Sequence, residues 1–224
     1  MATSKKPKLP LAITPQQVID FADHMLGKYG LKAIDKRKAE EIKLISSFLE
    51  KMGLLGYAAD GTPLSIDDFV KRYSIVIGNR VYFPWTIGNA EECRLSNQIS
   101  TITHECQHTI QFHKDGWKYL FNYLTSTAKR AYYEADAYKC NMELHYWATG
   151  QILSPASLAG LLKNYGCKSM DIKICEQTLS FAANMLKRNQ VTTPASLEAI
   201  SWLNKNMPKY KGQGDTMPAR FYEV

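Results

Sequence analysis

Apolar residues recur at helical spacing along most of the chain, and the runs stop at Gly, Pro and Asp. A first helix is predicted to begin at Thr14-Pro15, because Thr is a good N-cap and Pro suits the first helical position, and to end at the glycines of residues 27–30. Further helices are predicted over residues 37–52 and 65–73. From about Leu95 the pattern stays helical almost to the end.

The period changes in one stretch, residues 73–83, which is rich in β-branched and aromatic residues around Gly78-Asn79. This pattern predicts an antiparallel hairpin, and it is the only strong strand signal in the sequence. The expected fold is therefore α+β and mainly helical, with a small antiparallel sheet just before the helix that starts near Leu95. Ser154-Pro155 and Thr193-Pro194 predict two more helix starts of the kind seen at the N-terminus.

One domain accounts for most of the chain. Residues 1–13 are rich in Lys and Pro and predict a flexible basic arm, and residues 207–224 are rich in Lys, Gly and Pro and predict an irregular tail. No linker divides residues 14–206, which are expected to form a single mostly helical domain. At 224 residues the chain is long enough to bury a core without disulfides.

The chain has 28 Lys+Arg against 21 Asp+Glu, a net charge of +7. Such an excess would assist contact with nucleic acid. The basic residues available for it are those of the arm and of one C-terminal cluster, namely Lys5, Lys6, Lys8, Lys205, Lys209 and Lys211. The sequence contains no helix-turn-helix, zinc-finger or RNA-recognition motif, so a nucleic-acid partner has no motif to support it.

The apolar runs and the cysteines of the sequence predict where the protein is located. The sequence has no apolar stretch of signal-peptide type after the basic N-terminus and no run of about 18 apolar residues, which predicts no contact with a membrane. Its five cysteines are scattered without a CxxC pair, which is typical of reduced thiols. A cytoplasmic protein is expected, and packaging in a virus particle is compatible with the same features. The oligomeric state is not predicted.

The candidate metal-binding and catalytic residues include His104-Glu105-Cys106-Gln107-His108, an HExxH motif. Residues i and i+4 share one face of a helix, so the two imidazoles can bind one Zn²⁺ while Glu105 reaches the water on the metal. An apolar stripe on the opposite side of the same helix is formed by Leu95, Ile99, Ile102, Cys106 and Ile110. The helix can therefore bury one side and turn the motif toward a cleft, and Cys106 is expected to pack in the core.

A catalytic zinc site usually has three protein ligands. Glu134 is the preferred third candidate, carried by a second helix that returns after a loop at Asp115-Gly116. Asp136 competes with it, although the two cannot face the same metal from one helix. His145 is a weaker rival, since it lies about 16 Å further along that helix. Metzincin peptidases are excluded by Gln111 and Lys114, which replace their Gly and third His.

HECQH followed by YEADAY at residues 133–138 resembles the gluzincin-type zinc metallopeptidases. The layout is most similar to small intracellular peptidases of the phage-repressor and radiation-response regulator type, and the resemblance covers residues 73–148. It implies a zincin-like core with a sheet beside the active-site helix, and a zinc ion held by His104, His108 and Glu134. Tyr138 replaces the acidic residue that thermolysin-like peptidases have four positions after the ligand Glu. The partners of the zinc histidines are therefore unassigned.

The leading hypothesis is a zinc-dependent peptidase acting on a protein or peptide, with Glu105 as the general base for a zinc-activated water. An edge strand within residues 75–83 could hold an extended peptide. The donor to the oxyanion is left open between Tyr132, Tyr133, Tyr138 and His145. The alternative is a structural or regulatory protein, such as a virion component, that keeps a zinc site without turnover.

Overall fold

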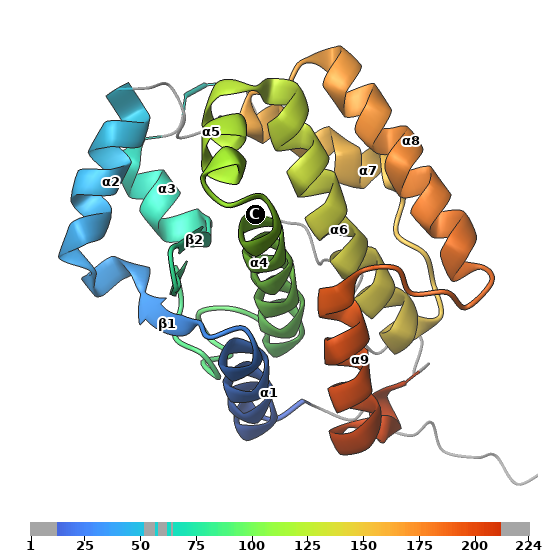
Figure 1. The fold of residues 1–224 in the computed structure, drawn as a ribbon. Helices are drawn as coiled ribbons and strands as arrows, with labels where there is room; N and C mark the ends of the chain where they lie inside the picture. The colour runs from blue at the N-terminus through green and yellow to red at the C-terminus, as the bar shows by residue number, and fades with distance from the viewer. Residues whose placement is uncertain (1–12, 52–56, 58–61, 64, 212–224) are drawn as a thin grey trace, which may run out of the picture.

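The structure is a computed structural model that describes residues 13–51, 57, 62–63 and 65–211 (Figure 1). The helices are α1 (Pro15–Lys28), α2 (Glu40–Lys51), α3 (Ile66–Arg72), α4 (Leu95–Asp115), α5 (Trp117–Thr125), α6 (Thr127–Thr149), α7 (Pro155–Gly160), α8 (Ser169–Leu186) and α9 (Pro194–Asn206). The strands are β1 (Lys32–Asp35), β2 (Ile75–Ile77) and β3 (Arg80–Phe83), and short 3₁₀ turns are η1 (Lys36–Lys38), η2 (Leu161–Tyr165) and η3 (Pro208–Tyr210). The predicted mainly helical α+β class is confirmed.

Helix α1 begins as the sequence predicts. Thr14 and Gln17 form a capping box, in which the Thr14 hydroxyl accepts from the Gln17 backbone N–H and the Gln17 side chain accepts from the Thr14 N–H. Pro15 occupies the first turn, where a missing N–H costs nothing. The helix buries its apolar face against α4, so the N-terminal segment is part of the same core.

The small sheet differs from the prediction in one respect. Strands β2 and β3 form the expected antiparallel hairpin, with Gly78 at φ 60° in the turn. Strand β1 pairs with β3 in parallel, giving the order β1-β3-β2, so the expectation of a purely antiparallel sheet is wrong. The reason is that β1 has the sequence KAID and no buried residue, so it lacks the alternation that marks a strand. Among the described residues β2 is an edge strand.

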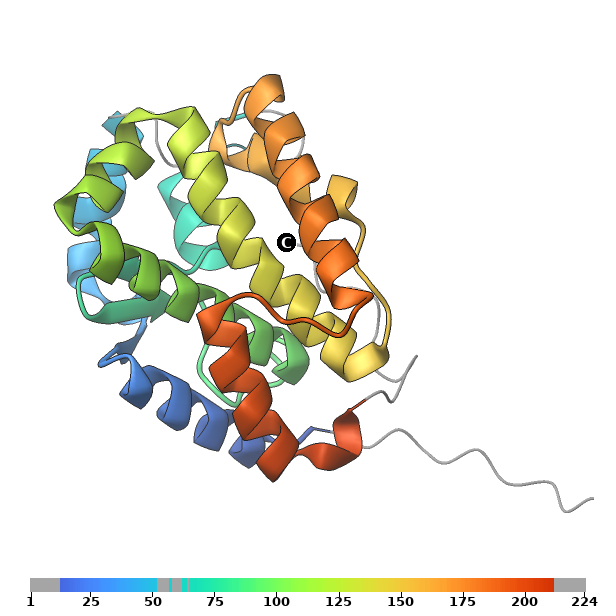
Figure 2. The same ribbon diagram turned by 45° about the vertical axis from the view of Figure 1, so that its right-hand side comes forward.

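Helix α4 runs through the middle of the molecule, with α1, α6 and α9 packed around it (Figures 1 and 2). The apolar stripe predicted for it is confirmed. Ile99, Ile102 and Cys106 are buried in the main hydrophobic cluster, and Leu95 and Ile110 pack against that cluster. Burial of this stripe orients α4, and it turns the other side of the helix, with the HExxH histidines, toward α6.

Helix α6 lies between α4 and α8 and contributes to a second apolar cluster with α7, η2 and α8 (Figure 2). Helix α5 was not predicted as a separate helix, because one helix was expected to return from the loop at Asp115-Gly116, whereas the chain breaks again at Ser126. The chain beyond residue 150 packs on the rest of the domain, and it remains packed past the expected boundary at residue 206. Met207 and Tyr210 are buried in the main cluster. Ile13, expected at the end of the arm, also packs against it, whereas residues 1–12 and 212–224 lie outside the described residues.

The start of α9 is held by a buried carboxylate. Glu143 on α6 is 1% exposed. It accepts hydrogen bonds from the backbone N–H groups of Thr192 and Thr193 and from both threonine hydroxyls. Gln107, within the HExxH motif, accepts from the N–H of Ala195 in the first turn of α9. The C-terminal helix is thus anchored on the two helices that carry the motif.

None of the described helices is both long and apolar enough to cross a membrane.

Replacing Glu143 by Gln should lower the free energy of unfolding by about 1–3 kcal/mol, because the amide can accept from fewer of the four donors that the carboxylate binds. Urea denaturation checks this. Glu176→Gln, at an exposed position on α8, is the matched control and should change stability by less than about 0.5 kcal/mol. Equal unfolding midpoints for the two variants would contradict the anchoring role.

Candidate metal centre

Three of the residues predicted as metal ligands lie together in the structure. His104 and His108, one turn apart on α4, have their Nε2 atoms 3.1 Å apart. Glu134 faces them from α6, with its Oε2 3.6 Å from Nε2 of His104 and its Oε1 3.6 Å from Nε2 of His108. One ligand atom from each of the three residues lies within 4.8 Å of the others, so this buried group could hold a metal ion.

These separations suit a single ion. Ligand atoms about 2.0–2.1 Å from a common tetrahedral metal are roughly 3.4 Å from one another. The observed 3.1 and 3.6 Å lie on either side of that value. The donor set, two imidazoles and one carboxylate, is of the kind that Zn²⁺ binds.

The neighbours of His104 determine which nitrogen of its neutral ring carries the proton. Its Nδ1 lies 2.9 Å from the amide oxygen of Asn141, whose NH₂ donates to the Ser100 hydroxyl at 2.7 Å. The amide oxygen can only accept, so Nδ1 carries the proton and donates it. In neutral His104 the Nε2 atom then presents a lone pair toward His108 and Glu134.

His108 is oriented in the same way. Its Nδ1 lies 2.9 Å from the amide oxygen of Gln111, whose NH₂ donates to the backbone carbonyl of Tyr133 and to Asp136. Because a carbonyl only accepts, the orientation of the Gln111 amide is settled, and Nδ1 of His108 must donate. If both histidines were neutral, their Nε2 atoms would present lone pairs to each other, which is unfavourable unless a proton or a metal ion lies between them.

Glu134 is 2% exposed. Its Oε1 accepts a hydrogen bond of 2.5 Å from the Tyr123 hydroxyl, while its buried Oε2 has no hydrogen-bond donor among the described residues. Burial by itself would raise the pKa of Glu134, but the two histidines outweigh it and hold the pKa below the usual range. The carboxylate is thus ionised, with one oxygen available to a metal.

Glu105 is 6% exposed and follows His104 on α4. Burial raises its pKa, and the nearby histidines oppose that rise. A carboxylate whose pKa is raised toward neutrality is a stronger base than an exposed one. Glu105 is the residue for which the sequence predicts the role of general base.

The rival ligands lie elsewhere. Asp136 accepts from Gln107 and Gln111 and pairs with Lys139, so it supports the site from outside the ligand group. His145, about three turns further along α6, is not in the group.

The structure also distinguishes the residues predicted as possible donors to the oxyanion. Tyr132 is 58% exposed, and the Tyr133 hydroxyl donates to Asp115. The ring of Tyr138 packs edge-on against the ring of His104, with centroids 5.3 Å apart. Among the four predicted candidates Tyr138 is therefore the one that contacts a ligand side chain.

Four residues that support the metal group were not predicted from the sequence. Asn141 and Gln111 orient the histidines, and Tyr119 and Tyr123 of α5 contact His108 and Glu134. Two of these had a detectable signal: Gln111 follows His108 by three positions and Asn141 follows Glu134 by seven, so each shares a helix face with a ligand. The two tyrosines belong to the helix that was not predicted.

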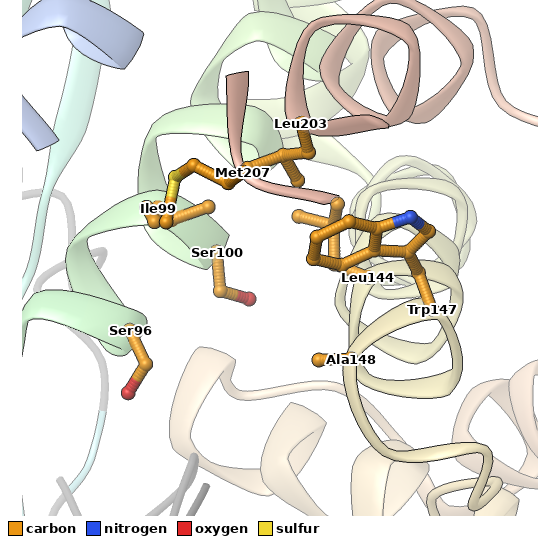
Figure 3. Close-up of a pocket in the computed structure, with 8 residues that line it drawn as sticks. All are labelled: Ser96, Ile99, Ser100, Leu144, Trp147, Ala148, Leu203 and Met207. Carbon is orange, nitrogen blue, oxygen red and sulfur yellow. The ribbon is translucent and has the colours of Figure 1, made fainter. Parts of the chain in front are cut away.

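A small apolar pocket lies at the other end of the α4–α6 interface (Figure 3). It is lined by Ser96, Ile99, Ser100, Leu144, Trp147, Ala148, Leu203 and Met207. Its volume of about 20 Å³ is close to that needed for one water molecule. Ser100 links it to the metal group through Asn141, but a pocket of this size does not hold a peptide side chain.

Comparison with known protein families, with curated proteins and with solved structures found no match for this chain. Fold and site together define a mainly helical α+β protein with a buried His₂Glu group that could hold a metal ion.

Metal binding at this group should release protons. Burial tends to lower the pKa of His108, but Glu134 and Glu105 outweigh it and raise the pKa from 6.5 to about 9. Metal-free His108 is therefore protonated at pH 7.5, and zinc must displace about one proton per chain. Zinc affinity should rise as the pH rises toward 9.

Calorimetric titration of chelator-treated protein with zinc, in two buffers of different ionisation enthalpy, measures this release. The observed heats should differ by the difference between the two buffer enthalpies. Identical heats in both buffers would contradict the assigned protonation of His108.

Proposed function

We propose that this protein is a zinc-dependent peptidase. The observation that carries the proposal is the pair of facing Nε2 atoms of His104 and His108, 3.1 Å apart, beside the ionised and under-bonded Glu134. The Nδ1 atoms of both histidines donate hydrogen bonds to amide oxygens, which leaves the Nε2 lone pairs for a metal. These lone pairs, the negative charge of Glu134 and the spacing of the three residues suit a zinc ion.

A zinc ion held there would supply Lewis acidity, polarising a peptide carbonyl and making a water molecule more acidic. Glu105 would take a proton from the attacking water and deliver it to the leaving amine. His104, His108 and Glu134 hold the ion, and Asn141 and Gln111 keep the imidazoles in the required tautomer. These roles form the minimal set for hydrolysis of a peptide bond.

An extended peptide is the proposed substrate. Strand β2 packs on α4, and its outer edge is not paired within the described residues. Unpaired backbone groups on an edge strand can bind an extended chain through main-chain hydrogen bonds. Such pairing recognises the backbone and leaves the choice of side chain to the surrounding pockets.

A second candidate is a structural or regulatory zinc protein without turnover. The observation that favours it is the low exposure of the group: His104 and His108 are 9% and 8% exposed, and Glu134 is 2% exposed. Structural zinc sites are closed, whereas catalytic ones keep a position open to water and substrate. The two candidates differ in whether Glu105 is needed.

Glu105→Gln should retain about one zinc per chain, because the ligands are unchanged, and should lose peptide cleavage by about 10²–10⁴-fold. Zinc is measured by elemental analysis and cleavage with fluorescently labelled casein and a mixed peptide library. Glu176→Gln, exposed on α8, is the control and should behave as the unmodified protein.

Equal cleavage by Glu105→Gln and the unmodified protein would overturn the assigned role of Glu105. Zinc without cleavage in the unmodified protein would favour the structural alternative. Absence of zinc from unmodified protein prepared in zinc-containing medium would overturn both.

A further inference from the structure

Helix α5 carries two tyrosines whose hydroxyls contact proposed metal ligands. The Tyr123 hydroxyl donates to Oε1 of Glu134 at 2.5 Å, and the Tyr119 oxygen lies 3.2 Å from Nδ1 of His108. The two tyrosines are one turn apart, so they share a face of α5. The inner side of this helix is therefore in direct contact with the metal group.

The outer side of α5 is exposed. No residue of this nine-residue helix is classed as buried, and its outer side exposes apolar residues, namely Trp117, Leu120 and Phe121. It follows Gly116, whose φ of 58° and ψ of −139° suit only glycine. Helices with few buried contacts have low local stability. Among the contacts that hold α5 in place are those of Tyr119 and Tyr123 on its inner side and the packing of Leu124 in a small apolar cluster around Phe69.

The C-terminal end of α5 is held by one buried cation. Arg130 of α6, 8% exposed, donates to the backbone carbonyls of Tyr123 and Leu124 at 2.8 and 3.0 Å. A third donor of Arg130 reaches the carbonyl of Tyr165 at 2.7 Å. These bonds place the Tyr123 backbone against α6, close to Glu134.

The hydrogen bond from Tyr123 also determines which oxygen of the Glu134 carboxylate is available to a metal ion. With Oε1 engaged by the phenol, Oε2 is the oxygen left without a hydrogen-bond donor among the described residues. Groups that hydrogen-bond to metal ligands fix the ligand orientation and influence the affinity for the metal. Loss of the phenol would leave Glu134 free to rotate, with an unpaired buried oxygen.

We propose that Tyr123 is a positioning residue for Glu134 and that it couples metal binding to the docking of α5 over the site. This inference rests on the metal-binding part of the proposed function and not on peptidase activity. Coupling of this kind is reciprocal: if docked α5 strengthens zinc binding, bound zinc stabilises docked α5 by the same factor.

The positioning role of Tyr123 is tested by the zinc affinity of the full chain, measured by competition with a chelating dye. Tyr123→Phe should weaken zinc binding by about 10- to 100-fold, the usual effect of removing a partner of a metal ligand. Tyr82→Phe is the matched control, because it removes a phenol–carboxylate hydrogen bond (to Glu41) on strand β3, away from the metal group. The control should leave zinc affinity unchanged.

The coupling between metal binding and the docking of α5 is tested by hydrogen exchange of the unmodified protein, without relying on a variant. Added zinc should slow exchange of the amides of residues 117–125, with α8 as the internal reference that should not change. In Tyr123→Phe the effect of zinc on these amides should be reduced by the factor by which its affinity falls.

The outcomes separate this inference from the proposed function. Tight zinc binding by both tyrosine variants, with no effect of zinc on exchange in α5, overturns the inference and leaves the metal centre intact. Weaker binding by Tyr82→Phe as well would show a general effect on stability and overturn the specific role. Failure of the unmodified protein to bind zinc overturns the inference and the proposed function together.

Discussion

Two imidazole nitrogens facing each other at 3.1 Å are the constraint on which this structure depends. Both Nδ1 atoms are engaged by amide oxygens of Asn141 and Gln111, and the amide nitrogens of these two residues donate to the Ser100 hydroxyl and the Tyr133 carbonyl. Neutral histidines so arranged repel each other, and an ionised carboxylate close by demands positive charge. A proton satisfies part of that demand, and a bound divalent metal ion would satisfy all of it.

The architecture supports this geometry from both sides. Helix α4 buries an apolar stripe in the main core, which turns the histidines toward α6, and α6 is held in turn by α8 and its apolar cluster. Gln107 and Glu143 anchor the start of α9 on these two helices. The C-terminal third of the chain thus serves to fix the α4–α6 interface, in which the metal group lies.

Much of the site could be predicted because it obeys helical periodicity. His104 and His108 are one turn apart, and Glu134 stands on the next long helix, so spacing alone suggested the group. Helix α5 was missed because it is short and aromatic, without a buried stripe, and strand β1 because KAID has no alternation. Contacts such as that of Tyr123 with Glu134 depend on how helices pack, and local pattern does not encode packing.

The most direct test of the metal centre is zinc X-ray absorption spectroscopy of the purified protein. The proposed zinc site predicts about one zinc per chain with two imidazole nitrogens and further oxygen ligands at about 2.0–2.2 Å in four-coordinate geometry. Loss of the imidazole signal in a His104→Ala, His108→Ala double variant would tie the spectrum to these residues. A spectrum without imidazole scattering, or one unchanged in the double variant, would contradict the assignment of the metal centre.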